Sequence, residues 1–176
     1  MRFLDTSLNG LVIVDPAPVT DERGAFTRVW CATEFREAGL RTRVVQCNVS
    51  TNTARGTLRG MHYQCEPHGE IKIVRCTSGV VFDVVIDLRP DSPTFCRWEG
   101  LELTSASGRM LYIPEGLAHG FQTLTDDATL EYQMSEYYAP DHARGVRWDD
   151  PLFGVNWPLP VSRISPRDAS YSDFAR

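Results

Sequence analysis

The stretch Val80-Val-Phe-Asp-Val-Val-Ile-Asp-Leu88 is the most apolar run in the chain. Its even-numbered residues are all apolar, so this side of the predicted strand belongs to a core. On the other side, Asp83 stands beside Val81 and Val85. A carboxylate among apolar neighbours is typical of a semi-polar cavity inside a sandwich rather than of open solvent. The run is also too short to span a bilayer.

Five more β-prone runs accompany this stretch, and turn signals rich in Gly, Pro, Asp and Ser separate them. They cover 71–75, 97–103, 110–113, 121–124 and 128–134. Six short strands at close spacing predict an all-β sandwich or barrel, and a jelly roll provides the cavity that Asp83 requires. Only two short helices are expected: one capped by Thr33 and ending at Gly39, and one beginning at Ser165-Pro-Arg-Asp168.

Length and composition limit the remaining possibilities. The chain has 176 residues, of which 42% are hydrophobic and 23% charged, and no linker or repeat interrupts it, so we expect a single domain over 1–176. The net charge of −5 argues against non-specific electrostatic binding of nucleic acid. The five cysteines form no CxxC pair, and Asp5 and Asn9 interrupt any secretory signal. These features predict a cytoplasmic protein with reduced cysteines and no membrane partner.

Two segments carry the densest candidate chemistry: Arg55-Gly-Thr-Leu-Arg-Gly-Met-His-Tyr-Gln64 and Ile113-Pro-Glu-Gly-Leu-Ala-His-Gly-Phe121. The second has the spacing of the second half of the cupin signature. The first half of that signature needs a His-x-His pair, whereas here His62 is followed by Gln64. A metal ion usually takes three or more ligands, so we predict no metal site. A metal-dependent cupin isomerase or oxygenase is an alternative that metal analysis would decide.

Strand alternation makes a further prediction about the first segment. It places His62 and Gln64 on one face and Arg59, Met61 and Tyr63 on the other.

Several strings occur in one order over nearly the whole chain. They include Asp21-Glu-Arg-Gly24 with Phe26, Gln46-x-Asn48-x-Ser50, Leu58-Arg-Gly-Met-His-Tyr-Gln64, Lys72-Ile-Val-Arg75, Ser92-Pro-Thr-Phe95, Tyr137-Tyr138 and Ser165-x-x-Asp168-Ala169. In these strings the chain resembles the dTDP-4-dehydrorhamnose 3,5-epimerase family. The resemblance implies a cupin-type jelly-roll sandwich, a homodimer that exchanges N-terminal strands, and no metal or organic cofactor.

The resemblance also implies a chemistry, which is epimerisation at C3, C5 or both of a nucleotide-linked 4-keto-6-deoxy sugar. A proton next to a ketone is acidic because the resulting anion delocalises onto oxygen, so the reaction needs a base, an oxyanion stabiliser and an acid on the opposite face. In family terms, His62 is the base and Asp168 its orienting partner. Tyr132 is the acid, and Lys72 stabilises charge on the C4 oxygen.

The remaining residues that the resemblance assigns would bind substrate. Arg23, Arg59 and Arg167 would hold the diphosphate. Gln46, Asn48 and His119 would contact the sugar or the phosphates. Phe26 and Tyr138 would pack against the nucleotide base, with Arg23 and Phe26 supplied by the partner subunit.

Three departures from the family pattern stand out. Arg28 and Ala143 replace carboxylates that approach the nucleoside, and Glu70 stands where small or polar residues are common. Arg28 either contacts the acceptors of another base or points toward solvent or the diphosphate, so the base stays open. Two alternative functions also stay open: a 3-epimerase that never inverts C5, and a catalytically silent sugar-binding cupin or structural jelly-roll protein.

Overall fold

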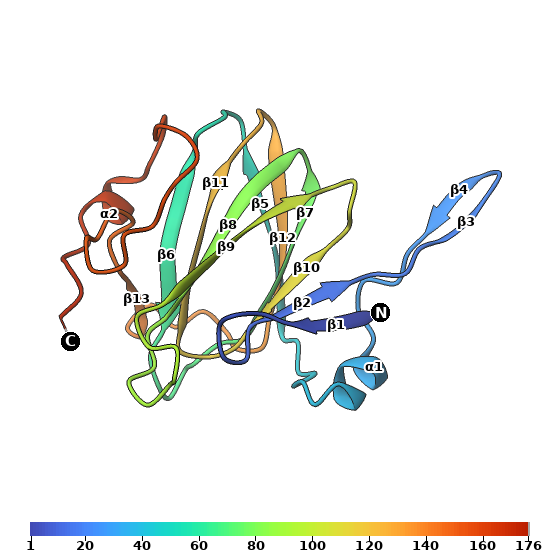
Figure 1. The fold of residues 1–176 in the computed structure, drawn as a ribbon, viewed down its shortest axis with the longest axis horizontal. Helices are drawn as coiled ribbons and strands as arrows, with labels where there is room; N and C mark the ends of the chain where they lie inside the picture. The colour runs from blue at the N-terminus through green and yellow to red at the C-terminus, as the bar shows by residue number, and fades with distance from the viewer. Residues whose placement is uncertain (176) are drawn as a thin grey trace.

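Two antiparallel sheets face each other in the computed structural model, which describes residues 1–175 (Figure 1). The first sheet has the strand order β1-β2-β10-β7-β12-β5, and the second has the order β13-β6-β11-β8-β9. This arrangement confirms the predicted jelly-roll sandwich with a few short helices.

The elements follow one another along the chain as β1 (Arg2–Asp5), β2 (Val12–Asp15), β3 (Val19–Asp21), β4 (Gly24–Phe26), α1 (Ala32–Glu37), β5 (Gln46–Asn52), β6 (Leu58–Gln64), β7 (Lys72–Ser78), β8 (Val80–Asp87), β9 (Trp98–Thr104), β10 (Met110–Ile113), β11 (Leu117–Thr123), β12 (Ala128–Met134), β13 (Ala143–Gly145) and α2 (Pro166–Ala169). All six predicted strands are present, with ends shifted by up to four residues.

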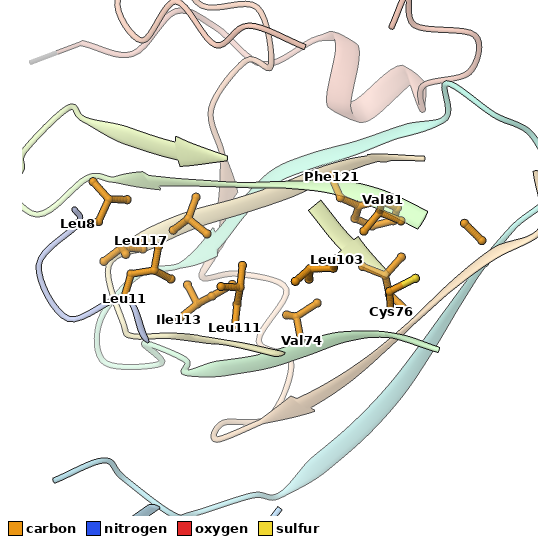
Figure 2. Close-up of a cluster of buried hydrophobic side chains, with 13 residues drawn as sticks. Leu8, Leu11, Val74, Cys76, Val81, Leu103, Leu111, Ile113, Leu117 and Phe121 are labelled. Carbon is orange, nitrogen blue, oxygen red and sulfur yellow. The ribbon is translucent and has the colours of Figure 1, made fainter. Parts of the chain in front are cut away.

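The space between the sheets is filled by apolar side chains from alternate positions (Figure 2). Val81 and Phe121 come from the second sheet, and Val74 and Leu111 come from the first. Each of these four side chains is at most 1% exposed. Burial of a large aliphatic or aromatic side chain contributes about 1.5–3 kcal/mol, so this layer fixes how the two sheets sit against each other.

Strand β8 is buried on both faces. Val81, Asp83 and Val85 point between the sheets, as the sequence predicts, and Asp83 is fully buried. Val84 and Ile86 are buried as well, and Phe82 partly so, but in a separate outer layer under the C-terminal segment, where Val84 and Ile86 pack with Val146 and Phe153. A strand covered on both sides explains why this run is nearly continuously apolar.

A bulge in β6 changes the predicted alternation. The pairing of β11 with β6 shifts between His119, opposite His62, and Phe121, opposite Arg59. Gly60 has φ +137°, and a Cβ built on it would lie 2.5 Å from the Cα of Gly120. Only glycine fits this contact. As a result Arg59 lines the same cavity as His62, so the prediction that they face opposite ways is wrong.

The two helices differ from each other in how they begin. Helix α1 starts after Cys31, which makes no side-chain cap, and not at Thr33 as predicted. Its Phe35 packs against Tyr112 on the outer face of the first sheet, so tertiary packing supports this short helix. Helix α2 begins as predicted, because the Ser165 hydroxyl accepts a hydrogen bond from the Asp168 amide at 3.0 Å.

The hairpin of β3 and β4 projects away from the sandwich (Figure 1), and all six of its strand residues are exposed. No helix of residues 1–175 is long and apolar enough to cross a membrane. Within the same part of the chain, the five cysteines form no disulfide.

We predict that Asp87 stabilises the fold in a pH-dependent way. Burial alone would raise the pKa of its carboxyl, but hydrogen bonds from Arg89, Ser92 and Thr94 lower that pKa from 3.8 to about 2. The lowered pKa contributes roughly 2 kcal/mol above pH 4, and this contribution disappears as the pH falls toward 2.

Urea unfolding of wild type and Asp87→Asn measures this contribution. We expect the two free energies of unfolding to differ most at pH 7 and to converge between pH 4 and pH 2. Asp91→Asn, at an exposed position in the same loop, is the control and should match wild type. A difference for Asp87→Asn that stays constant with pH contradicts the prediction.

Candidate active site

A cavity of about 330 Å³ opens between the two sheets at the end where β5 and β6 face each other. The first sheet contributes side chains from β5, β7 and β12, and the second contributes them from β6, β11 and β13. Polar side chains enter the cavity from both sheets, together with apolar ones such as Phe121 and Met134, whereas the core cluster beside it is apolar. This is the semi-polar cavity that we predicted from the position of the Asp83 carboxylate among apolar neighbours.

His62 and Asp168 form a pair at the edge of this cavity. His62 Nε2 lies 2.7 Å from Asp168 Oδ1, and the second carboxylate oxygen accepts from the Gly60 amide at 3.3 Å. Burial alone would raise the pKa of the Asp168 carboxyl, but its hydrogen bond with His62 and the other donors hold that pKa below the usual range. An ionised carboxylate only accepts, so Nε2 carries the ring proton and Nδ1 is left as the basic nitrogen.

A second histidine that lines the cavity also contacts a carboxylate. His119 Nε2 lies 2.8 Å from Asp83 Oδ2, and both side chains are almost fully buried. The ring of Tyr132 meets the ring of His119 edge to face, with centroids 5.9 Å apart. Burial, and then the nearby charge of Asp83, raise the pKa of Tyr132 well above its ordinary value. Its phenol therefore keeps its proton at neutral pH.

Lys72 reaches the cavity from β7 and is held by one hydrogen bond and one ion pair. Its Nζ donates to the His62 carbonyl at 2.9 Å and lies 3.1 Å from Glu70 Oε1. An ammonium group has three N–H donors, so one remains for a molecule in the cavity. Lys72 thereby links the first sheet to the strand that carries His62.

The structure brings together most of the side chains that the sequence singles out. Nine of them line the cavity: Gln46, Asn48, Arg59, His62, Lys72, His119, Tyr132, Tyr138 and Arg167. Asp168 lies directly behind His62.

The three N-terminal candidates lie elsewhere in this chain. Arg23 and Phe26, on the projecting hairpin, are 84% and 78% exposed. Arg28 pairs with Glu34 of α1 at 2.8 Å.

Sequence reasoning missed several residues that line the cavity: Ser50, Tyr63, Gln64, Glu70, Phe121, Met134 and Arg144. Alternation could have found two of them, because Ser50 continues the face of Gln46 and Asn48, and Glu70 continues the face of Lys72. In residues 1–175, no three His, Cys, Asp or Glu side chains are grouped closely enough to hold a metal ion.

Gln64 connects β6 to the loop that carries Tyr138. Its amide nitrogen donates to the carbonyls of His68 (3.0 Å) and Tyr137 (3.2 Å), and its oxygen accepts from the Ala139 amide (2.7 Å). At the position where a metal-binding cupin has a second histidine, this chain has a side chain that holds two loops in place.

Comparison with known proteins identifies what this cavity belongs to. The family model described as dTDP-4-dehydrorhamnose 3,5-epimerase matches residues 5–176. The chain belongs to the dTDP-4-dehydrorhamnose 3,5-epimerase family. It is an epimerase, within the isomerase class.

Individual relatives agree with the family assignment. The chain is 45% identical to the dTDP-4-dehydrorhamnose 3,5-epimerase of Methanothermobacter thermautotrophicus, with 90% of this chain and 84% of that protein covered. It is 40% identical to the dTDP-4-dehydrorhamnose 3-epimerase of Streptomyces niveus, with 96% and 81% covered. The crystal structure of the Legionella pneumophila dTDP-6-deoxy-D-glucose-3,5-epimerase in complex with dTDP-4-keto-L-rhamnose superposes with a TM-score of 0.91 at 37% identity, with 97% and 90% covered.

We predict that Gln64→Met destabilises the fold by about 1–3 kcal/mol, because two loop carbonyls and one amide lose their partner. Denaturant unfolding measures the change. Gln133→Met is the matched control, since the side-chain oxygen of Gln133 is buried without a hydrogen-bond partner in the described residues. Equal effects of the two substitutions would argue against the role of Gln64.

Proposed function

We propose that this family member inverts C3, C5 or both of a nucleoside-diphosphate-linked 4-keto-6-deoxy sugar, without a metal or organic cofactor. The observation that carries the proposal is the placement of the His62–Asp168 pair, Tyr132 and Lys72 around one cavity. His62 Nδ1 removes the proton from a carbon next to the C4 ketone. The electron pair of that C–H bond delocalises onto the C4 oxygen, where the Lys72 ammonium stabilises the negative charge.

Tyr132 then returns a proton to the same carbon from the opposite face. His62 lies on the second sheet and Tyr132 on the first, so a sugar ring between the sheets has the base on one side and the acid on the other. The phenolate left on Tyr132 takes a proton from solvent, and the His62 imidazolium releases one. Asp168 supports the imidazolium while it exists.

Other observations support the proposal that the substrate carries a nucleoside diphosphate. The Legionella structure holds a dTDP-linked keto sugar. In this chain Arg59 and Arg167 line the cavity that we propose for the substrate. A guanidinium binds phosphate oxygens through paired donors, so these side chains suit a diphosphate. Tyr138 is 57% exposed beside the cavity and can stack on a base.

A C3-only epimerase is the second candidate function, and the Streptomyces niveus relative carries that name. A silent sugar-binding cupin is less well supported. A purely binding cavity does not need a histidine oriented by a buried carboxylate together with a protonated tyrosine on the facing sheet.

Deuterium exchange tests the mechanism. The enzyme is incubated with a nucleotide-linked 4-keto-6-deoxy sugar in D₂O, and NMR reads which carbons gain deuterium. We expect His62→Ala to lose exchange at every carbon by roughly 10²–10⁴-fold. Tyr132→Phe should keep exchange but lose net inversion, because removal of the proton survives and delivery to the opposite face does not.

Each variant has a result that rejects its role. Normal exchange in His62→Ala would exclude His62 as the base. Inversion at the wild-type rate in Tyr132→Phe would make that tyrosine a packing residue only.

We further infer that the enzyme is a homodimer in which the β3–β4 hairpin of each subunit reaches the cavity of the other. The hairpin leaves its own sandwich (Figure 1), and neither Arg23, in its turn, nor Phe26, at the end of β4, lines the cavity described above. Phe26 is 78% exposed and Val19 is 72% exposed. Large apolar side chains with this much exposure are typical of a surface that a partner covers.

Mixed dimers test the shared site. His62→Ala and Arg23→Glu chains are each expected to be nearly inactive alone. When they are co-expressed, one cavity of the mixed dimer contains both native side chains, so activity should return. Failure to regain activity, with a dimer mass confirmed by light scattering, would place Arg23 outside the partner's site.

A further inference from the structure

Glu70 stands out in the cavity because of its charge. Among the described residues that line it, Glu70 is the one carboxylate, beside the cations Arg59, Lys72, Arg144 and Arg167. A negative charge is unfavourable where a diphosphate binds and an oxyanion forms, unless it has a specific partner. The proposed mechanism gives Glu70 no task.

The position of Glu70 is well defined. It lies in the extended segment two residues before Lys72, the first residue of β7, and both side chains line the cavity. The two side chains are 9% and 7% exposed, and Glu70 Oε1 lies 3.1 Å from Lys72 Nζ. In residues 1–175, no group donates a hydrogen bond to Glu70 Oε2. The pair therefore offers a free N–H donor on Lys72 and a free acceptor on Glu70, side by side.

A donor and an acceptor about one hydrogen-bond length apart match a ketone oxygen and a hydroxyl on adjacent carbons. If the C4 oxygen takes the free N–H of Lys72, the neighbouring C3 hydroxyl lies within reach of the Glu70 carboxylate, which can only accept. C5 carries a methyl group and the ring oxygen, so the other side of the ketone offers no hydroxyl donor. The match therefore also orients the ring.

We propose that Glu70 is a specificity-determining residue that binds the C3 hydroxyl of the sugar and turns the C3 side of the ring toward β7. The proposal rests on the proposed function, because it takes Lys72 as the partner of the C4 oxygen. A hydroxyl-to-carboxylate hydrogen bond is charge-assisted and short, so a substrate without that hydroxyl leaves Glu70 Oε2 without a donor in the cavity.

The test compares two substrates within each enzyme. They are the 4-keto-6-deoxy sugar nucleotide and its 3-deoxy analogue, with kcat/KM taken from deuterium incorporation at C5 or C3. Wild type should prefer the hydroxylated substrate by at least about tenfold, the value of one hydrogen bond to a charged group. In Glu70→Met, which has no acceptor, the ratio should fall close to one, and in Glu70→Gln it should be intermediate.

The ratio of the two kcat/KM values separates a loss of hydroxyl recognition from a general loss of activity. Loss of the Glu70 partner also affects Lys72, but that effect slows both substrates and cancels in the ratio. Glu131→Gln removes a carboxylate of β12 that pairs with Arg75 of β7 on the outer face of the sheet, and should keep the wild-type ratio.

The outcomes also distinguish this proposal from the proposed function. No exchange with either substrate in wild type would reject the proposed function. Exchange with the parent substrate and a wild-type ratio near one would reject only the role of Glu70. An unchanged preference in Glu70→Met would do the same.

Discussion

The close contact between Gly60 of β6 and Gly120 of β11 is the constraint on which the site depends. A Cβ on Gly60 would lie 2.5 Å from the Gly120 Cα, and a Cβ on Gly120 would lie 2.7 Å from the Arg59 carbonyl. With glycine at both positions, the strands can form the bulge that interrupts alternation. The bulge brings Arg59 and His62 to the same cavity, and the Gly60 amide becomes a donor to Asp168.

Asp168 connects this bulge to the end of the chain. Its amide is held by the Ser165 cap of α2, and its carboxylate accepts from both Gly60 and His62. A short helix thus places a charge more than one hundred residues away in sequence beside the proposed base. The outer layer formed by Val84, Ile86 and Phe153 covers the second sheet and packs the C-terminal segment against it. Packing remote from the cavity therefore supports the geometry of the proposed base.

The two histidines of the cavity sit in different environments. His62 is 42% exposed and keeps one nitrogen free, whereas His119 is 4% exposed and uses Nε2 against a fully buried carboxylate. Exchange of protons with a substrate requires the first kind of environment. The second kind suits a fixed wall of the cavity, against which Tyr132 packs edge to face. Residue type alone does not distinguish the two, but burial does.

The amino-acid sequence by itself determined the sandwich, because the alternating run through β8 and its five companions leaves few other ways to bury apolar side chains. It also determined the start of α2, whose Ser165-Pro-Arg-Asp168 signal is local, and through its family motifs it indicated nine of the side chains that line the cavity. Only the tertiary structure decided the facing of Arg59, the Cys31 start of α1, the loop contacts of Gln64 and the pairing of Glu70 with Lys72. These features depend on a bulge, on packing and on contacts between distant segments, and the local sequence pattern does not encode such distances.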